Sequence, residues 1–302
     1  MNYRHAFHAG NHADVLKHVV LIALLEVFKR KDSPLFVLDT HAGRGRYLLA
    51  GEESRKTVEA EAGVMRLMVQ PPLPELIERY LKAIQADNSV SRQGASAAQK
   101  PARASAGIQI KHYPGSPLLA AQMLRTQDRM AFCELQPEEA AALAALFSHD
   151  TRVRVHSGDG YAAVRAFLPP RAGTTRIGRG LVLIDPPYEA QDAEYPRILD
   201  CLRETLTRWP QASCAVWYPI KQRRSLLPFF RKAAALPAKS VLLSELLVRP
   251  DDSPLRLNGS GMLLLNAPWQ FDQMLAPALP ALKTHLGEAG ASTRLEWLKR
   301  PV

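Results

Sequence analysis

The sequence predicts an α/β protein with a mainly parallel, doubly wound sheet. Short apolar runs alternate with amphipathic stretches along the chain, which is typical of strand–helix–strand units. The apolar run at 181–184 ends at Asp185-Pro186-Pro187-Tyr188, where two residues without a backbone N–H must end a strand. A loop with two glycines, Gly43 and Gly45, follows the first strand-like run, as expected where the backbone approaches a ligand closely.

The first element is predicted to be a helix over residues 11–30. Asn11 is a good N-cap, and Asp14 stands three residues later in a position like that of a capping box. Apolar side chains recur at helical spacing over 15–28 and predict one apolar face. A break at 31–34 then separates this helix from the first strand.

An insertion is predicted between the first and second strands. An acidic residue at the end of the second strand normally follows the glycine loop by roughly 20 residues, but the matching Glu134 comes far later. We therefore expect one domain over 1–302 that carries an inserted helical subdomain at 53–110. Its tract 86–107 is rich in Ala, Ser, Gln and Arg and lacks aromatics, which predicts a flexible loop.

The other elements follow from the same patterns. The predicted strands are 35–39, 130–135, 153–155, 181–184 and 213–219, with a closing pair at 241–248 and 261–266. One helix is predicted to begin near 46, and the other predicted helices span 59–68, 74–85, 118–124, 137–147, 161–167 and 195–208.

Composition limits the class of protein. The chain has 302 residues, enough for a sizeable core, and no segment resembles a signal peptide or membrane span. Three scattered cysteines without a C-x-x-C pair favour a reducing cytoplasm. The net charge of +10 favours a polyanion such as nucleic acid as partner, although a basic surface can also serve solubility alone.

The loop after the strand at 181–184 is the strongest candidate for catalysis. In open α/β sheets, ligands bind at the carboxyl ends of the strands. There, Asp185 and the Pro186 carbonyl offer acceptors for the two N–H groups of a planar amine, and the Tyr188 ring offers a surface for stacking. The same tetrapeptide could also be a plain turn that ends a strand.

Three other strand ends predict a nucleoside-shaped cleft. Asp39 ends the first strand, and Gly43 after it permits close backbone approach. Glu134 suits a ribose diol, and Asp159 beside Gly160 can accept from an adenine amine. Each feature alone is compatible with an ordinary turn or an exposed carboxylate. Their order together with Asp185 makes the ligand-binding interpretation much more specific.

Histidines concentrate at the amino terminus, where His5, His8, His12 and His18 are four of the nine in the chain. Such clustering raises a metal site, but no cysteine or close acidic partner accompanies these residues. The other interpretation is that the segment 7–18 folds over a cofactor. We favour the second interpretation and expect no metal.

The Asp185 tetrapeptide resembles motif IV of amino-methyltransferases that use S-adenosylmethionine. The chain as a whole, from Tyr3 to about Trp269, resembles the bacterial RlmJ family of 23S rRNA adenine-N6 methyltransferases. The motifs that carry this resemblance are Tyr3-Arg4-His5, 7–18, 39–43 with 45–47, 113–117 and 183–189. The chain departs from the family pattern mainly in the 86–107 tract.

The resemblance implies a Rossmann-like class I methyltransferase fold, S-adenosylmethionine as cofactor and 23S rRNA as partner. It implies transfer of a methyl group to adenine N6 in the cytoplasm, with no obligate protein partner. It places Tyr3 near the RNA. The residues implied to contact the cofactor or active centre are His18, His41, Ser116, Glu134, Asp159, Gly160 and Asp185.

Two alternatives stay open on the sequence. One is a DNA adenine-N6 or cytosine-N4 methyltransferase, because the tetrapeptide serves any planar amine. No helix-turn-helix or zinc-finger pattern accompanies it, which disfavours sequence-specific DNA recognition. The other is a non-catalytic rRNA-binding assembly factor, which the intact Asp185 and glycine loop disfavour.

Overall fold

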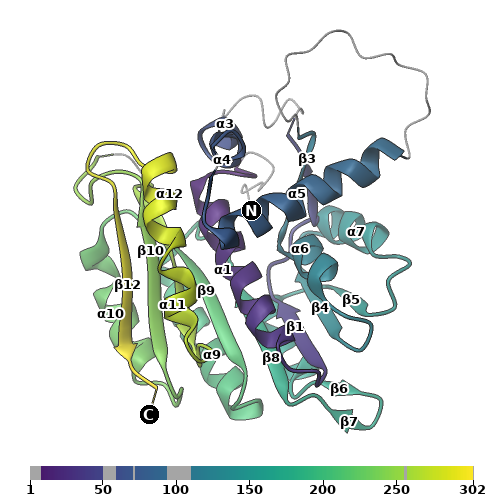
Figure 1. Ribbon diagram of the computed structural model, residues 1–302. Coiled ribbons are helices and arrows are strands. Elements are labelled where there is room, and N and C mark those ends of the chain that lie inside the picture. The colour runs from purple at the N-terminus through teal and green to yellow at the C-terminus, as the bar shows by residue number, and fades with distance from the viewer. Residues whose placement is uncertain (1–7, 50–58, 71, 94–109, 255–256, 302) are drawn as a thin grey trace.

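A computed structural model describes residues 8–49, 59–70, 72–93, 110–254 and 257–301. An eight-stranded sheet forms its centre (Figure 1). Five adjacent strands are parallel, and the other three each run antiparallel to their neighbours. The strands in spatial order are β12 (Ser292–Lys299), β10 (Val241–Leu247), β11 (Gly259–Leu265), β9 (Ser213–Ile220), β8 (Arg179–Ile184), β1 (Leu35–Asp39), β4 (Arg129–Glu134) and β5 (Val153–Ser157).

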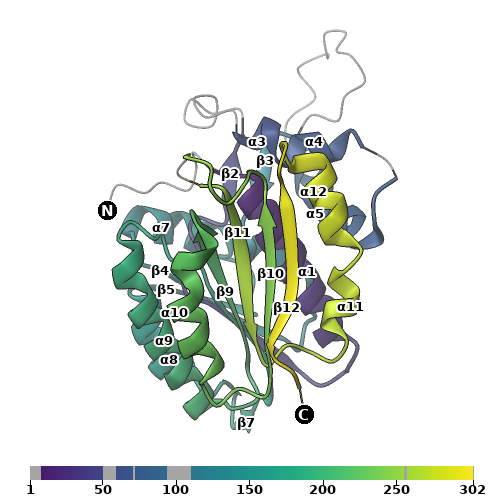
Figure 2. The ribbon, with the colours of Figure 1, turned by 90° about the vertical axis from the view of Figure 1, so that its left-hand side faces the viewer.

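Helices cover both faces of the sheet and give the predicted doubly wound arrangement (Figure 2). Each face buries its own apolar cluster. On one face lie α1 (His12–Lys29), α6 (Ser116–Met123), α7 (Pro137–Leu146), α11 (Phe271–Leu275) and α12 (Ala278–Leu286). On the other lie α8 (Gly160–Phe167), α9 (Gln191–Arg208) and α10 (Arg223–Ala234).

Helix α1 differs from its prediction. Asn11 caps it as expected, since its side chain accepts hydrogen bonds from the N–H groups of Ala13 and Asp14. However, every residue from Ala13 to Leu25 is buried, so the prediction of a single apolar face was wrong. Helices from the insertion and β11 of the sheet enclose α1 from different sides, and even its charged residues are removed from water.

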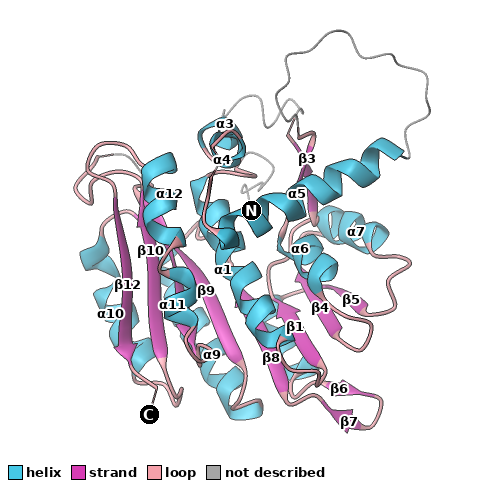
Figure 3. Ribbon diagram, in the orientation of Figure 1, coloured by secondary structure: helices cyan, strands magenta, loops and turns pink. Residues whose placement is uncertain are grey.

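The insertion packs over the start of α1 (Figure 3). It contains α3 (Glu59–Ala62), α4 (Val64–Met68) and α5 (Glu75–Gln93), in agreement with the predicted helical segments. The predicted helix near Arg46 was wrong, because β2 (Arg46–Leu48) is a strand that pairs with β3 (His112–Pro114). Tyr47 lies opposite Tyr113 in this pair, so a tertiary contact overrides the local pattern.

The prediction of a flexible loop from residue 86 was also wrong in its first third. Residues 86–93 continue α5, and Asp87 and Asn88 are buried. The Asn88 side chain donates to the His112 carbonyl and accepts from the N–H groups of Lys111 and His112. It therefore anchors α5 to β3. The rest of the tract lies outside the described residues.

The predicted strands are all present, and β10 and β11 form the expected closing pair. Beyond the predictions, β12 adds a further antiparallel strand beside β10, and a small hairpin, β6 (Arg171–Ala172) with β7 (Thr175–Arg176), precedes β8. Within the described residues, no helix is long and apolar enough to cross a bilayer.

Candidate active site

The predicted site residues meet at one edge of the sheet. Strands β5, β4, β1 and β8 are parallel neighbours, so their carboxyl ends lie side by side. Asp39 ends β1, Glu134 ends β4, Asp159 follows β5 and Asp185 follows β8. The sequence therefore placed all four carboxylates at the correct edge. Tyr3 and His5 lie outside the described residues.

Lys17, a residue without a predicted role, holds Asp185 in place. The Lys17 ammonium donates to Asp185 Oδ2 at 2.6 Å and lies 2.8 Å from Asp14 Oδ1. Only 6% of the Lys17 side chain, 3% of Asp14 and 15% of Asp185 is exposed. Asp14 is itself fixed, because its Oδ2 accepts from the Gly10 N–H at 2.9 Å. A buried ion triad thus links α1 to the loop after β8.

The charges in this triad depend on one another. Burial alone lowers the pKa of Lys17, but the adjacent carboxylates of Asp14 and Asp185 outweigh it and raise that pKa well above its ordinary value. Lys17 is therefore cationic at any physiological pH. The sequence signal was available: Asp14 and Lys17 stand three residues apart within an apolar helical run, where unpaired charges are not tolerated.

Asp39 lies next to this triad and is buried. The Ser116 hydroxyl donates to its Oδ2 at 2.6 Å, and the His41 N–H donates to its Oδ1 at 3.2 Å. Burial raises the pKa of Asp39 to about 6, against the opposing effect of these two hydrogen bonds. Ser116 begins α6 and so connects that helix to the end of β1.

His41 is held as a neutral ring. Because the Thr40 hydroxyl donates to the Leu183 carbonyl, it must accept from His41 Nδ1–H at 2.8 Å, which leaves Nε2 as an acceptor. Burial lowers the pKa of His41 to about 4. The ring also packs edge-on against Tyr161, with centroids 4.8 Å apart. His41 can therefore accept a hydrogen bond at neutral pH.

Asp159 is the N-cap of α8, where its Oδ1 accepts from the Tyr161 N–H and its Oδ2 faces Arg197. The ordinary turn role that the sequence allowed is thus present. Gly160 is required by close packing, since a Cβ there would lie 1.8 Å from the Thr40 carbonyl oxygen. This contact locks the end of β1 against the start of α8.

Glu134 is connected to the glycine loop. Its Oε2 accepts from the Gly43 N–H at 2.9 Å and its Oε1 accepts from the Gln136 N–H at 2.7 Å. Burial raises its pKa, while these backbone hydrogen bonds act in the opposite direction. Gly43 has φ +61°, and a Cβ there would meet the Tyr47 hydroxyl at 2.1 Å. A carboxylate has about four acceptor positions, so Glu134 can accept from further donors.

Tyr188 is oriented inward. Its hydroxyl donates to the Trp217 carbonyl at 2.6 Å, and its ring packs against the rings of Tyr195 and Trp217. The residue is 8% exposed, and its φ of 50° is unusual for a residue other than glycine. In this structure the side chain fixes the loop after Asp185 onto β9 and presents little surface for stacking.

His8 and His18 contact different partners. His8 lies 3.0 Å from the Glu59 carboxylate, and buried His18 lies 2.7 Å from the Tyr113 hydroxyl, which meets that of Tyr80. These contacts tie the amino terminus and α1 to the insertion. Within the described ranges, no group of three or more His, Cys, Asp or Glu side chains could hold a metal ion.

Comparisons with known proteins identify the family of this chain. The family described as "RsmJ: Ribosomal RNA large subunit methyltransferase D, RlmJ" matches residues 32–299. The chain is 40% identical to ribosomal RNA large subunit methyltransferase J of Haemophilus influenzae and 37% identical to that of Escherichia coli, over 99% of each chain. Protein LPL1258 of Legionella pneumophila, a crystal structure, superposes with a TM-score of 0.80 at 31% identity, covering 96% of this chain and 98% of that one. The protein thus belongs to the RlmJ family of ribosomal RNA large subunit methyltransferases.

Proposed function

We propose that this protein transfers a methyl group from S-adenosylmethionine to the exocyclic N6 of an adenine in 23S rRNA. The observation that carries the proposal is Asp185, fixed by Lys17 at the carboxyl end of β8 beside the nucleoside-shaped set of Asp39, Glu134 and Asp159. The fold is the Rossmann-like fold of class I methyltransferases, whose cofactor is S-adenosylmethionine.

The donor set suits this cofactor. Glu134 can accept hydrogen bonds from the ribose hydroxyls, and the Gly43 N–H holds its carboxylate in place. Asp159 and the neutral His41 offer acceptors on the β5 and β1 sides of the same edge. When bound, the cofactor supplies an electrophilic methyl group on a sulfonium. We assign its binding to His18, His41, Gly43, Ser116, Glu134, Asp159, Gly160 and Asp185.

Asp185 is proposed to bind the substrate amine. Lys17 donates to Oδ2, and among the described residues no hydrogen bond involves Oδ1, which can accept from N6–H. The Pro186 carbonyl would accept the second N–H. Together these acceptors favour a more tetrahedral nitrogen, whose lone pair is otherwise delocalised into the ring, and positioning supplies much of the acceleration. The Lys17 ammonium stabilises the Asp185 carboxylate and holds its orientation.

Tyr188 and Tyr3 are proposed to contact the flipped base and the RNA. Single-stranded or extruded bases are commonly stacked on aromatic rings. Because Tyr188 is almost buried here, stacking on it requires the loop after Asp185 to rearrange when substrate binds. The motion would break the hydrogen bond from the Tyr188 hydroxyl to the Trp217 carbonyl.

Transfer of tritiated methyl groups to naked 23S rRNA and to duplex DNA tests the proposal. We expect label in the rRNA, with N6-methyladenosine as the product after digestion and mass spectrometry. Label in DNA but not in rRNA would favour the DNA methyltransferase alternative. Absence of both label and cofactor binding by calorimetry would favour a non-catalytic assembly factor. We further propose that the protein acts in the cytoplasm without an obligate protein partner.

A further inference from the structure

A basic groove lies near the amino ends of the parallel strands, whereas Asp185 lies at their carboxyl ends. It encloses about 640 Å³ beside the start of β4, the end of α8 and the β6–β7 hairpin. Among the described residues that line it, four are arginines and none carries a carboxylate. The arginines are Arg129, Arg152, Arg154 and Arg171.

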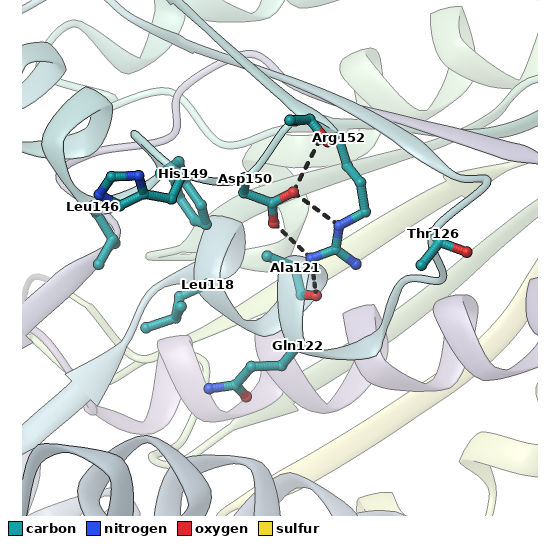
Figure 4. Close-up of a pocket in the computed structure, with 10 residues that line it drawn as sticks. Leu118, Ala121, Gln122, Thr126, Leu146, His149, Asp150 and Arg152 are labelled. Atoms are coloured by element: carbon teal, nitrogen blue, oxygen red, sulfur yellow. Dashed lines mark hydrogen bonds and ion pairs between the residues drawn. The ribbon is translucent and has the colours of Figure 1, made fainter. Parts of the chain in front are cut away.

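One of these arginines is structural. Arg152 donates from Nε and from a terminal nitrogen to the Asp150 carboxylate, and also to the carbonyls of Ala121 and Leu124. Figure 4 shows the Asp150 and Ala121 contacts in a neighbouring pocket of about 580 Å³ between α6 and α7. Arg152 therefore fixes the turn before β5, and its charge is balanced by Asp150.

The other three arginines differ from Arg152 in their contacts. Arg129 donates only to backbone carbonyls, those of Thr126 and Asp128. Arg154 and Arg171 are exposed. In the part of the chain that the structure describes, no ion pair involves Arg129, Arg154 or Arg171. The groove thus carries about three uncompensated positive charges in a concave surface.

An exposed sheet edge lies between the groove and the candidate active site. Strand β5 is the last strand of the sheet on this side, and both Arg154 and His156 on it are exposed. The strand runs from the groove toward Asp159 and is five residues long, about 17 Å. A polyanion that lies along this edge can contact the groove and the carboxyl edge together.

We propose that this groove binds the phosphate backbone of the RNA substrate at a distance from the methylated base. The proposal rests on the proposed function. Arginine is the residue best suited to phosphate, because its planar guanidinium can donate two hydrogen bonds at once. Contacts to phosphates position a nucleic acid without reading its sequence. The groove would therefore orient the rRNA while Asp185 and its neighbours bind the target base.

The test compares two triple variants with the same change in net charge. The groove variant is Arg129→Gln, Arg154→Gln and Arg171→Gln. The control variant is Arg203→Gln, Arg224→Gln and Arg231→Gln, exposed arginines on α9 and α10. Binding to a 23S rRNA transcript is measured between 50 and 300 mM KCl, together with steady-state methyl transfer. Because Arg129 has backbone contacts, the double variant Arg154→Gln, Arg171→Gln is measured as well.

We expect the groove variant to reduce the magnitude of the slope of log affinity against log salt concentration by about 2 to 3, and the double variant to reduce it by about 2. The KM for the transcript should rise about tenfold or more at unchanged kcat, and the control variant should resemble the native protein. Arg→Lys at the three positions should keep most of the slope.

Equal slopes and KM values for groove and control variants would overturn the groove proposal. If the native protein binds RNA with a slope that depends on the groove but methylates no RNA, the groove proposal survives and the proposed function fails.

Discussion

Removing the Lys17 ammonium should destabilise the folded protein much more than removing a surface cation does. In Lys17→Met, the carboxylates of Asp14 and Asp185 would remain beside an apolar side chain, with 3% and 15% of their side chains exposed. Breaking a buried pair by deleting one partner costs about 3–5 kcal/mol. We expect a loss in this range, equivalent to a fall of about 10 °C in the melting temperature.

A matched control is available on the surface. Arg203 and Asp200 also form an ion pair at 2.6 Å, but 59% and 75% of these side chains are exposed. Arg203→Met should therefore cost less than about 1 kcal/mol. The two pairs share a distance and differ in burial, so the comparison isolates desolvation.

The assay is urea unfolding followed by circular dichroism at pH 7 and fitted by linear extrapolation. The double variant Asp14→Asn, Lys17→Met removes one of the two stranded charges and should recover a substantial part of the loss. A cost for Lys17→Met within about 1 kcal/mol of the Arg203→Met cost would refute the argument, because it would show that the triad is solvated.

Three other outcomes are expected. Glu134→Ala should weaken cofactor affinity, measured by calorimetry, about tenfold or more, because charge-assisted hydrogen bonds contribute roughly 1.5–3 kcal/mol. Glu134→Gln should weaken the affinity less. Unchanged affinity in both variants would place the ribose elsewhere. Asn88→Ala should lower the free energy of unfolding by about 1–3 kcal/mol, since it leaves partly buried backbone groups at His112 unpaired. Shortening 94–107 should change that free energy little, and the reverse order would contradict the anchoring role. Burial raises the pKa of Asp39 to about 6, so ionisation of this carboxyl opposes folding. The stability of Asp39→Asn relative to the native chain should therefore rise between about pH 4 and pH 6 and stay constant at higher pH. A stability difference that does not depend on pH would show that Asp39 is not desolvated.

Several parts of the site followed directly from local sequence. A strand that ends at a carboxylate must place that group at the sheet edge, so Asp39, Glu134 and Asp185 could be located without coordinates. Likewise, Asn11 was recognised as a cap because its role depends only on residues two and three positions away. Local chemistry determines features of this kind.

Other parts depended on contacts between distant segments. The pattern of α1 predicted one apolar face, but α5, α6 and the sheet bury it on every side, and only this enclosure gives Lys17 its role. Residues 86–93 have a simple composition that favoured a loop, yet Asn88 is held by a strand 24 residues away. The Tyr188 ring was expected to be available for stacking, and only the coordinates show that Trp217 and Tyr195 cover it.

Asp185 is proposed to bind the amine that this protein methylates. The most direct measurement is nucleoside mass spectrometry of 23S rRNA treated with S-adenosylmethionine and either the native protein or Asp185→Ala, with cofactor affinity measured in parallel. We predict N6-methyladenosine with the native protein, none with the variant, and cofactor affinities within a few-fold of each other. Near-native turnover by Asp185→Ala, or methylation by the native protein at a different base atom, would contradict the assignment.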